Sequence, residues 1–177
     1  KIDDTKKQGN KILFVGRDFE RKNGNLVIEA FKLAKKIRNE LELYIVGPKL
    51  NVQIDGIHWV GDISYKDLPY YFNLCDIFCM PSKFEAYGIA FLEALIYGLP
   101  CIGRDAFEMP FFIEDGKTGY LLKHENANEL AELVLDLLDN DNIKQNVKDK
   151  RDYYIKEYSW DAVAKRMYDI IDNEAFN

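Results

Sequence analysis

The segment at residues 16–22, which reads GRDFERK, directly follows a short apolar run and contains fixed positive charges. Gly16 allows the backbone to turn and to approach a ligand closely. Arg17 can grip phosphate oxygens with two parallel hydrogen bonds, whereas Lys22 acts as a point charge. A hydrogen bond to a charged group contributes about 1.5–3 kcal/mol. The pattern indicates a site for a few phosphate groups, and the alternative is a solvated loop beside a helix.

A second segment, residues 81–94 (PSKFEAYGIAFLEA), combines two carboxylates with the start of a predicted helix. Unpaired backbone N–H groups at a helix N-terminus bind anions, and Gly88 leaves the approach to them open. Glu85 lies just before this helix, and Glu93 lies about two turns inside it among apolar side chains. A carboxylate there is unusual, and hydrogen bonds from a diol such as ribose would explain it. The alternative is that Glu93 faces water.

Short apolar runs alternate with amphipathic segments along the chain. We expect strands at residues 12–15, 41–46, 57–60, 77–80, 99–102 and 120–122, and helices at 23–37, 64–74, 87–97, 109–115, 126–138, 141–157 and 160–171. Ser64, with Asp67 three residues on, predicts a capping box. The alternation predicts an α/β fold, a Rossmann-like parallel sheet with helices on both faces. Such sheets bind ligands beyond the carboxyl ends of their strands, where both polar segments fall.

Size and composition narrow the class of protein. The chain has 177 residues, enough for one domain, which we place at residues 11–177 after a polar linker at residues 1–10. Its net charge of −6 argues against a nucleic-acid partner, which needs a dense basic face. No apolar run reaches the length of a membrane span, so we expect none.

The cysteine, histidine and aspartate residues do not suggest a metal site. The three cysteines are Cys75, Cys79 and Cys101. Their number is odd and their spacing fits no metal site, so we expect buried free thiols in a reducing cytoplasm. His58 and His124 lie far apart. The Asp-Asn-Asp run at residues 139–141 has the spacing of the metal-binding Asp-x-Asp pattern, but the end of one helix and the cap of the next explain it better.

Taken together and in order, these segments resemble glycosyltransferase family 4, a family of retaining enzymes with the two-domain GT-B fold. Residues 85–94 are similar to its signature Glu-Gly-Phe-Gly-Leu-x-x-x-Glu-Ala, and residues 16–22 to its Gly-Arg-x4-Lys. The Ser159-Trp160 pair near the C-terminus also fits. The resemblance implies that the chain is the C-terminal, nucleotide-sugar-binding half of a GT-B glycosyltransferase.

The resemblance also implies a catalytic role for three side chains. Arg17 and Lys22 would neutralise the diphosphate of the donor as negative charge develops on the leaving phosphate. Glu85 would hold the hydroxyls of the donor sugar and position its anomeric carbon. No metal or other cofactor is implied, and the configuration of the sugar would be retained.

The remaining implied site residues would bind the donor substrate without reacting: Gly16, Ile63, Met80, Gly88, Ile89, Glu93 and Phe107. The amides near Gly88 and Ile89 would bind the distal phosphate, and Glu93 would hold the ribose hydroxyls. The loop at residues 61–63 and the strand end near Met80 would flank the base, largely through backbone atoms.

One loop departs from the family pattern. Where relatives carry Gly-Gly-x-x-Glu, residues 105–111 read DAFEMPF, and Tyr87 and Ala86 replace the usual Phe and Gly. The Asp-Ala-Phe run that ends at Phe107 is similar to that of phosphatidylinositol mannosyltransferases. It favours GDP-mannose over a UDP-sugar as the donor.

The resemblance implies that the isolated domain is inactive, because the acceptor, a sugar or a lipid-linked sugar, would bind a missing N-terminal domain. The late helices would pack partly on that domain. We expect the whole protein in the cytoplasm or at the inner face of a membrane. Alternatives are a sugar-nucleotide epimerase of GT-B fold and a non-catalytic nucleotide-binding or interaction module. A nicotinamide dehydrogenase is disfavoured because no Gly-x-Gly-x-x-Gly follows the first strand.

Overall fold

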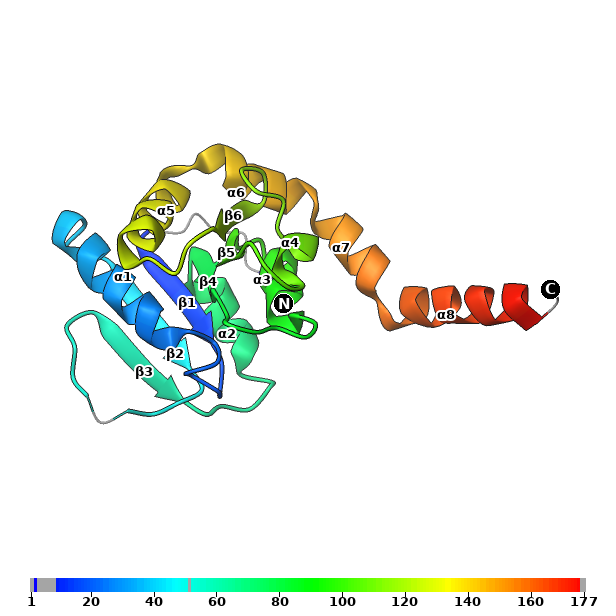
Figure 1. The fold of residues 1–177 in the computed structure, drawn as a ribbon, viewed down its shortest axis with the longest axis horizontal. Helices are drawn as coiled ribbons and strands as arrows, with labels where there is room; N and C mark the ends of the chain where they lie inside the picture. Colours follow the sequence, from blue (N-terminus) through cyan, green and yellow to red (C-terminus); the bar gives the residue numbers. More distant parts are fainter. Residues whose placement is uncertain (1, 3–8, 51, 176–177) are drawn as a thin grey trace.

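Six parallel strands form one sheet in the computed structural model, which describes residue 2, residues 9–50 and residues 52–175 (Figure 1). The strand order is β3-β2-β1-β4-β5-β6. Along the chain, the strands are β1 (Lys11–Val15), β2 (Glu42–Val46), β3 (Ile57–Gly61), β4 (Ile77–Cys79), β5 (Cys101–Arg104) and β6 (Gly119–Leu122). Each predicted strand is present within two residues of its predicted bounds, and the predicted fold class is confirmed.

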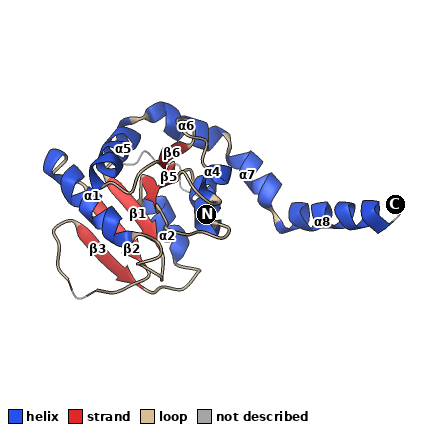
Figure 2. Cartoon of the chain, in the orientation of Figure 1, coloured by secondary structure: helices blue, strands red, loops and turns tan. Residues whose placement is uncertain are grey.

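Helices cover both faces of this sheet (Figure 2). They are α1 (Gly24–Ile37), α2 (Leu68–Leu74), α3 (Ile89–Ile96), α4 (Met109–Phe112), α5 (Ala127–Asp139), α6 (Asp141–Asp149), α7 (Arg151–Tyr158) and α8 (Trp160–Ala175). Right-handed crossovers that run in opposite directions along a sheet place their helices on opposite faces. The β1-α1-β2 and β4-α3-β5 units run in opposite directions, so α1, with α5 packed beside it, and α3 cover different faces.

The centre of the sheet is β1, which lies between β2 and β4. Leu13 of β1 is opposite Tyr44 on one side and Phe78 on the other. Ile12, Leu13 and Phe14 are at most 1% exposed, as expected for a strand buried on both faces. The strand order reverses between β1 and β4, and this switch point is where open α/β sheets bind their ligands.

The predicted capping box at residue 64 is wrong. Helix α2 begins at Leu68, and no side chain caps it. Ser64 Oγ donates a hydrogen bond to Asp67 Oδ2 at 2.7 Å, and the Asp67 N–H donates to the Ser64 carbonyl at 3.0 Å. The two side chains bond each other instead of the free N–H groups of a helix.

Several other predicted helices have different bounds. Helix α4 ends at Phe112 and not at residue 115, and α8 continues to Ala175 where the prediction ended at residue 171. Helix α3 begins at Ile89, two residues later than predicted, because Gly88 is left-handed with φ 83°. The predicted helix at residues 141–157 is divided into α6 and α7 at Lys150, whose ψ is −3°. This bend allows both Val147 of α6 and Tyr154 of α7 to be buried.

Helix α8 extends away from the domain, while α6 and α7 pack against α3 (Figure 1). The large apolar side chains of α8 are between 59% and 88% exposed: Trp160, Met167, Tyr168, Ile170 and Ile171. The late helices are therefore of two kinds, since α6 and α7 complete this domain and α8 leaves an apolar surface uncovered.

The predicted linker lies mostly outside the described residues, which include only Ile2, Gly9 and Asn10 of residues 1–10. The Asn10 carbonyl accepts a hydrogen bond from the Glu42 N–H at 2.8 Å, so residue 10 already bonds to the first residue of β2. Within the described part of the chain, no helix has the length and apolar character needed to cross a membrane.

Candidate functional site

Two loops meet at the switch point of the sheet, one after β1 and one after β4. The Lys83 N–H donates to the Arg21 carbonyl at 2.8 Å, and the Arg21 guanidinium donates to the Phe84 carbonyl at 2.8 Å. These bonds hold residues 16–22 and residues 81–85 side by side. The two polar segments of the sequence therefore form one site.

Lys22 and Glu85 form an ion pair between these loops. The Lys22 ammonium contacts Glu85 Oε2, and the two side chains are only 13% and 10% exposed. A Cβ on Gly16 would lie 2.7 Å from Lys22 Cγ, so the glycine gives the lysine side chain room to cross the end of β1. The structure thus brings three predicted residues into contact and buries a charge pair, which is costly unless both partners are present.

The N-terminus of α3 lies next to this pair. Gly88 precedes the helix in a left-handed conformation, and no side chain of the described residues caps the helix. A Cβ on Gly88 would lie 3.5 Å from Glu85 Cγ, which places the first turn of α3 against the carboxylate. Ile89 is 58% exposed and opens that turn. The free N–H groups of this end of α3 carry positive partial charge beside Lys22.

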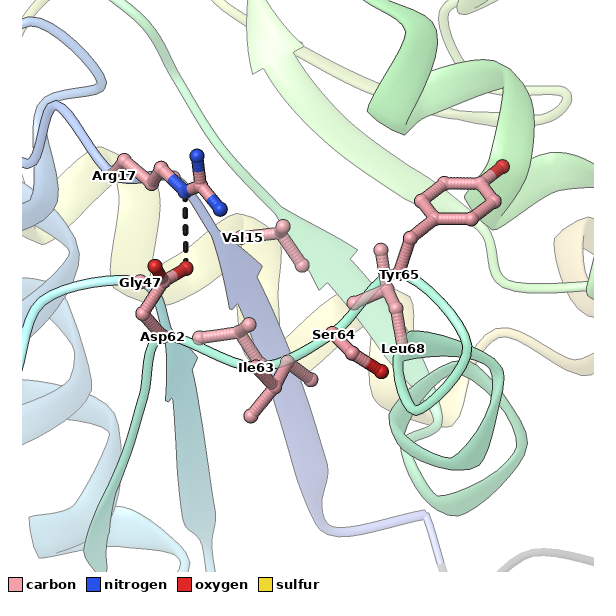
Figure 3. Close-up of a pocket in the computed structure, with 10 residues that line it drawn as sticks. Val15, Arg17, Gly47, Asp62, Ile63, Ser64, Tyr65 and Leu68 are labelled. Carbon is pink, nitrogen blue, oxygen red and sulfur yellow. Dashed lines mark hydrogen bonds and ion pairs between the residues drawn. The ribbon is translucent and has the colours of Figure 1, made fainter.

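Arg17 lines a pocket of about 160 Å³ between the ends of β1 and β2 and the loop after β3 (Figure 3). Its Nε donates to Asp62 Oδ1 at 2.9 Å, and both side chains are largely exposed. Gly16 and Ile63 also line the pocket. The close packing of its floor requires Gly47, because a Cβ there would lie 2.3 Å from the Gly16 carbonyl oxygen.

Glu93 is half-buried and accepts a hydrogen bond from the hydroxyl of Tyr65 at 2.5 Å. Burial raises the pKa of Glu93 above its ordinary value, and the bond to Tyr65 opposes that effect. The same bond raises the pKa of Tyr65 to about 12. Glu93 is therefore partly withdrawn from solvent and has a partner from the β3–α2 loop.

Met80 and Phe107 complete the predicted set. The Met80 side chain is fully buried, its N–H donates to the Ile102 carbonyl, and its carbonyl accepts from Ser82. Met80 does not line the pocket that contains Ile63, so the structure does not bring these two predicted residues together there. Phe107 has φ 55°, a strained value for an aromatic residue, and packs edge-on against Phe84 with ring centres 5.1 Å apart. The loop that departs from the family pattern therefore adjoins the Glu85 loop.

Sequence reasoning singled out none of three side chains at the site, although Asp62 lies in the loop at residues 61–63 that it placed beside the base. Asp62 and Tyr65 bond Arg17 and Glu93 from the β3–α2 loop, and Arg104, at the end of β5, bonds Glu125 at 2.6 Å and the Lys83 carbonyl at 3.3 Å. The signal that could have found them is their position, because each lies at or just after the carboxyl end of a strand.

The Asp-Asn-Asp run has structural partners. Asp139 pairs with Arg38, Asn140 Oδ1 caps α6 by accepting from the Ile143 N–H at 3.2 Å, and Asp141 pairs with Lys144. The predicted helix stop and cap are confirmed. Nowhere in the described residues do three His, Cys, Asp or Glu side chains gather as metal ligands would.

The three cysteines are buried free thiols in the structure, as the sequence predicts. Burial raises the pKa of the Cys79 and Cys101 thiols above their ordinary value. All three belong to the hydrophobic core, and none lines the pocket.

The sequence profile of the family described as glycosyl transferases group 1 matches residues 1–152. The chain belongs to this family. With the six-stranded parallel sheet, the match identifies a GT-B domain of the C-terminal, donor-binding type.

Known proteins of this kind share the fold and part of the sequence. Phosphatidyl-myo-inositol mannosyltransferase of Mycobacterium leprae is 25% identical over 94% of this chain and 47% of its own length. Poly(ribitol-phosphate) alpha-N-acetylglucosaminyltransferase of Staphylococcus aureus is 26% identical over 94% of this chain and 36% of its own length.

A solved structure, the pneumococcal O-GlcNAc transferase GtfA in complex with UDP and GlcNAc, superimposes with a TM-score of 0.78. It is 18% identical over 97% of this chain and 37% of that protein, so it shows the fold alone. The chain spans less than half the length of each of these three relatives.

Proposed function

We propose that this domain binds a nucleoside-diphosphate sugar and that the whole protein transfers the sugar to an acceptor. The observation that carries the proposal is the buried Lys22–Glu85 pair, which lies at the switch point of the sheet beside the uncapped N-terminus of α3. A cation and free backbone N–H groups can bind a diphosphate, while an adjacent carboxylate can accept hydrogen bonds from sugar hydroxyls.

In the proposed mechanism, the bond between the anomeric carbon and the diphosphate breaks through an oxocarbenium-like transition state. Negative charge then develops on the leaving phosphate, and Arg17, Lys22 and the end of α3 stabilise it as fixed positive potential. No metal is required for this role. Arg17 is free to turn from Asp62 to the phosphate because an exposed ion pair contributes only about 0–1 kcal/mol.

The other groups would position the donor. Glu85 would hold the sugar hydroxyls, Glu93 the ribose hydroxyls, and the pocket lined by Arg17 and Ile63 the base. We further propose that the acceptor attacks on the face of the leaving group, so that the configuration is retained.

Mannose, carried by GDP, is the proposed donor sugar. Its support is the Asp-Ala-Phe run ending at Phe107, which adjoins the Glu85 loop through Phe84. Relatives of two kinds match this chain, since one is a mannosyltransferase and another is an N-acetylglucosaminyltransferase. The identity of the donor must therefore be measured and cannot be taken from a relative.

We propose that the acceptor site lies on a second domain of the whole protein, against which α8 packs its exposed apolar side chains. The support is the apolar surface of α8, with Trp160 88% exposed. It follows that this domain alone binds nucleotide but transfers no sugar. Turnover by the isolated domain would contradict this part of the proposal.

Calorimetric titration of the domain with UDP, GDP and ADP, each with and without magnesium, tests the binding proposal. One nucleotide should bind without the metal, and Arg17→Ala and Glu93→Ala should each weaken it. Lys117→Ala and Glu132→Ala are matched controls, because each removes one charge from an exposed side chain that belongs to neither loop of the site and does not line the pocket. Equal loss in the site variants and the controls, or no binding by the folded wild type, would refute the proposal.

A further inference from the structure

Tyr65 stands between the pocket and Glu93. It belongs to the β3–α2 loop and lines the pocket together with Ile63 and Leu68 (Figure 3). Its hydroxyl reaches away from the pocket and donates to Glu93 Oε1 at 2.5 Å. Among the described residues, the pocket lining includes Tyr65 but not Glu93. The carboxylate proposed to bind ribose is thus separated from the pocket by one side chain that it holds in place.

We propose that Tyr65 is a latch, whose hydroxyl occupies the Glu93 carboxylate until the ribose of the donor replaces it. Turning the Tyr65 side chain aside joins Glu93 to the pocket, so Tyr65 sets how much of the binding free energy the ribose hydroxyls contribute. This inference rests on the proposed function, because it takes Glu93 as the ribose-binding carboxylate.

The chemistry of the two groups supports an exchange of partners. A carboxylate is only an acceptor, and a ribose diol that binds both of its oxygens competes directly for Oε1. The pKa of Tyr65, about 12, keeps the phenol protonated and able to donate near neutral pH. Hydrogen bonds from O–H to a carboxylate at 2.5–2.7 Å belong to the strong class, so ribose gains only the difference between the two partners.

Little besides one hydrogen bond holds the Tyr65 side chain in place. It is 75% exposed, although its ring borders the pocket, so little packing opposes its rotation. The bond to Glu93 is therefore the main interaction that holds it, and removing the hydroxyl should release the latch without a change in the fold.

Tyr65→Phe tests the latch, because it keeps the ring and removes only the donor. We expect this variant to bind the ribonucleoside diphosphate about tenfold more tightly than the wild type, since the nucleotide no longer displaces a charge-assisted bond. The 2′,3′-dideoxy form of the same nucleotide has no diol, so its affinity should be equal in the two proteins. Tyr70→Phe is the matched control, since Tyr70 is similarly exposed at 64% and does not line this pocket.

A second measurement follows Tyr65 itself. In protein labelled with carbon-13 at the tyrosine ζ position, the Tyr65 resonance is the one lost in Tyr65→Phe. Adding the ribonucleoside diphosphate should shift it in the direction that Glu93→Gln shifts it, and the dideoxy form should leave it in place.

Three outcomes would overturn the inference. Weaker binding of both nucleotides by Tyr65→Phe would show that the Tyr65 hydroxyl contacts the nucleotide directly. Equal binding of the ribonucleotide by wild type and variant would show that Tyr65 does not compete with ribose, and the proposed function would still stand. If neither protein binds any nucleotide, the proposed function fails, and the inference fails with it.

Discussion

Removal of one partner of the Lys22–Glu85 pair should cost far more stability than removal of both. The side chains are 13% and 10% exposed, so each charge is largely withdrawn from water. Breaking a buried pair on one side destabilises a protein by about 3–5 kcal/mol, because the remaining charge stays buried without a partner. The residual exposure here points to the lower end, about 3 kcal/mol, for Lys22→Met or Glu85→Met.

The double variant Lys22→Met/Glu85→Met should lie within about 1 kcal/mol of the wild type, because apolar side chains of similar size need no charged partner. For a chain of this length, about 3 kcal/mol corresponds to a fall in Tm of about 6–12 °C. Urea unfolding followed by the fluorescence of Trp59, which packs on Phe19 inside the domain, measures each free energy of unfolding.

The exposed Arg17–Asp62 pair provides the control, with side chains 80% and 63% exposed. Arg17→Met should lower the free energy of unfolding by at most about 1 kcal/mol. A double variant as unstable as the sum of the two single variants would show that Lys22 and Glu85 do not interact. Single variants as stable as Arg17→Met would show that water screens the pair, and the reasoning from burial would be wrong.

Two other features of the structure give measurable effects. Gly47 has φ 129°, and a Cβ there would lie 2.3 Å from a backbone oxygen. Gly116 is the control, because its φ of 72° is also positive but its surroundings are open. Gly47→Ala should therefore destabilise the domain by about 2 kcal/mol more than Gly116→Ala. The hydrogen bond from Lys150 lowers the pKa of Glu114 below its ordinary 4.5, so the stability it provides is present above pH 4.5 and is lost as pH falls through the lowered value. Unfolding measured from pH 7 to pH 3 should show a smaller decline in Lys150→Met, and equal declines would contradict the assignment.

The strands could be predicted from the sequence because each is a short apolar run that ends at a glycine, a proline or a polar residue. The same local signals located Lys22 and Glu85, since both follow strand ends that the switch point brings together. Local signals failed where side chains had other partners. Ser64 and Asp67 have the spacing of a capping box, but they bond each other.

The partners of Arg17 and Glu93 could not be predicted from the sequence. Arg17 and Asp62 are 45 residues apart, and Tyr65 and Glu93 are 28 apart. Only the strand order places the β3–α2 loop beside the loops after β1 and β4, and no pattern along the chain encodes that neighbourhood. Side chains such as Asp62 and Tyr65, which would compete with a ligand, are therefore harder to predict from the sequence than Arg17 and Glu93, which are proposed to bind it.

Every charged group proposed to bind the donor already has a partner within the protein. Asp62 bonds Arg17, Glu85 bonds Lys22, and Tyr65 bonds Glu93. These pairs differ in how easily a ligand can replace one partner. The Arg17–Asp62 pair is exposed, whereas the Lys22–Glu85 pair is buried. Glu85 also opposes an incoming phosphate, since it is a negative charge beside Lys22 in a site of low dielectric constant.

The Glu85 carboxylate should therefore favour the nucleotide sugar and disfavour the nucleoside diphosphate. Sugar hydroxyls donate to Glu85 and leave the charge of Lys22 for the phosphate, whereas a nucleoside diphosphate offers Glu85 no donor. Glu85→Gln should weaken binding of the nucleotide sugar about tenfold, as expected for the loss of a charge-assisted bond, and strengthen binding of the nucleoside diphosphate. Competition titrations of both ligands measure the two changes, with Glu132→Gln, an exposed carboxylate on α5 outside both loops of the site, as the matched control. If both affinities change in the same direction, Glu85 does not distinguish the sugar, and its proposed role at the anomeric centre is wrong.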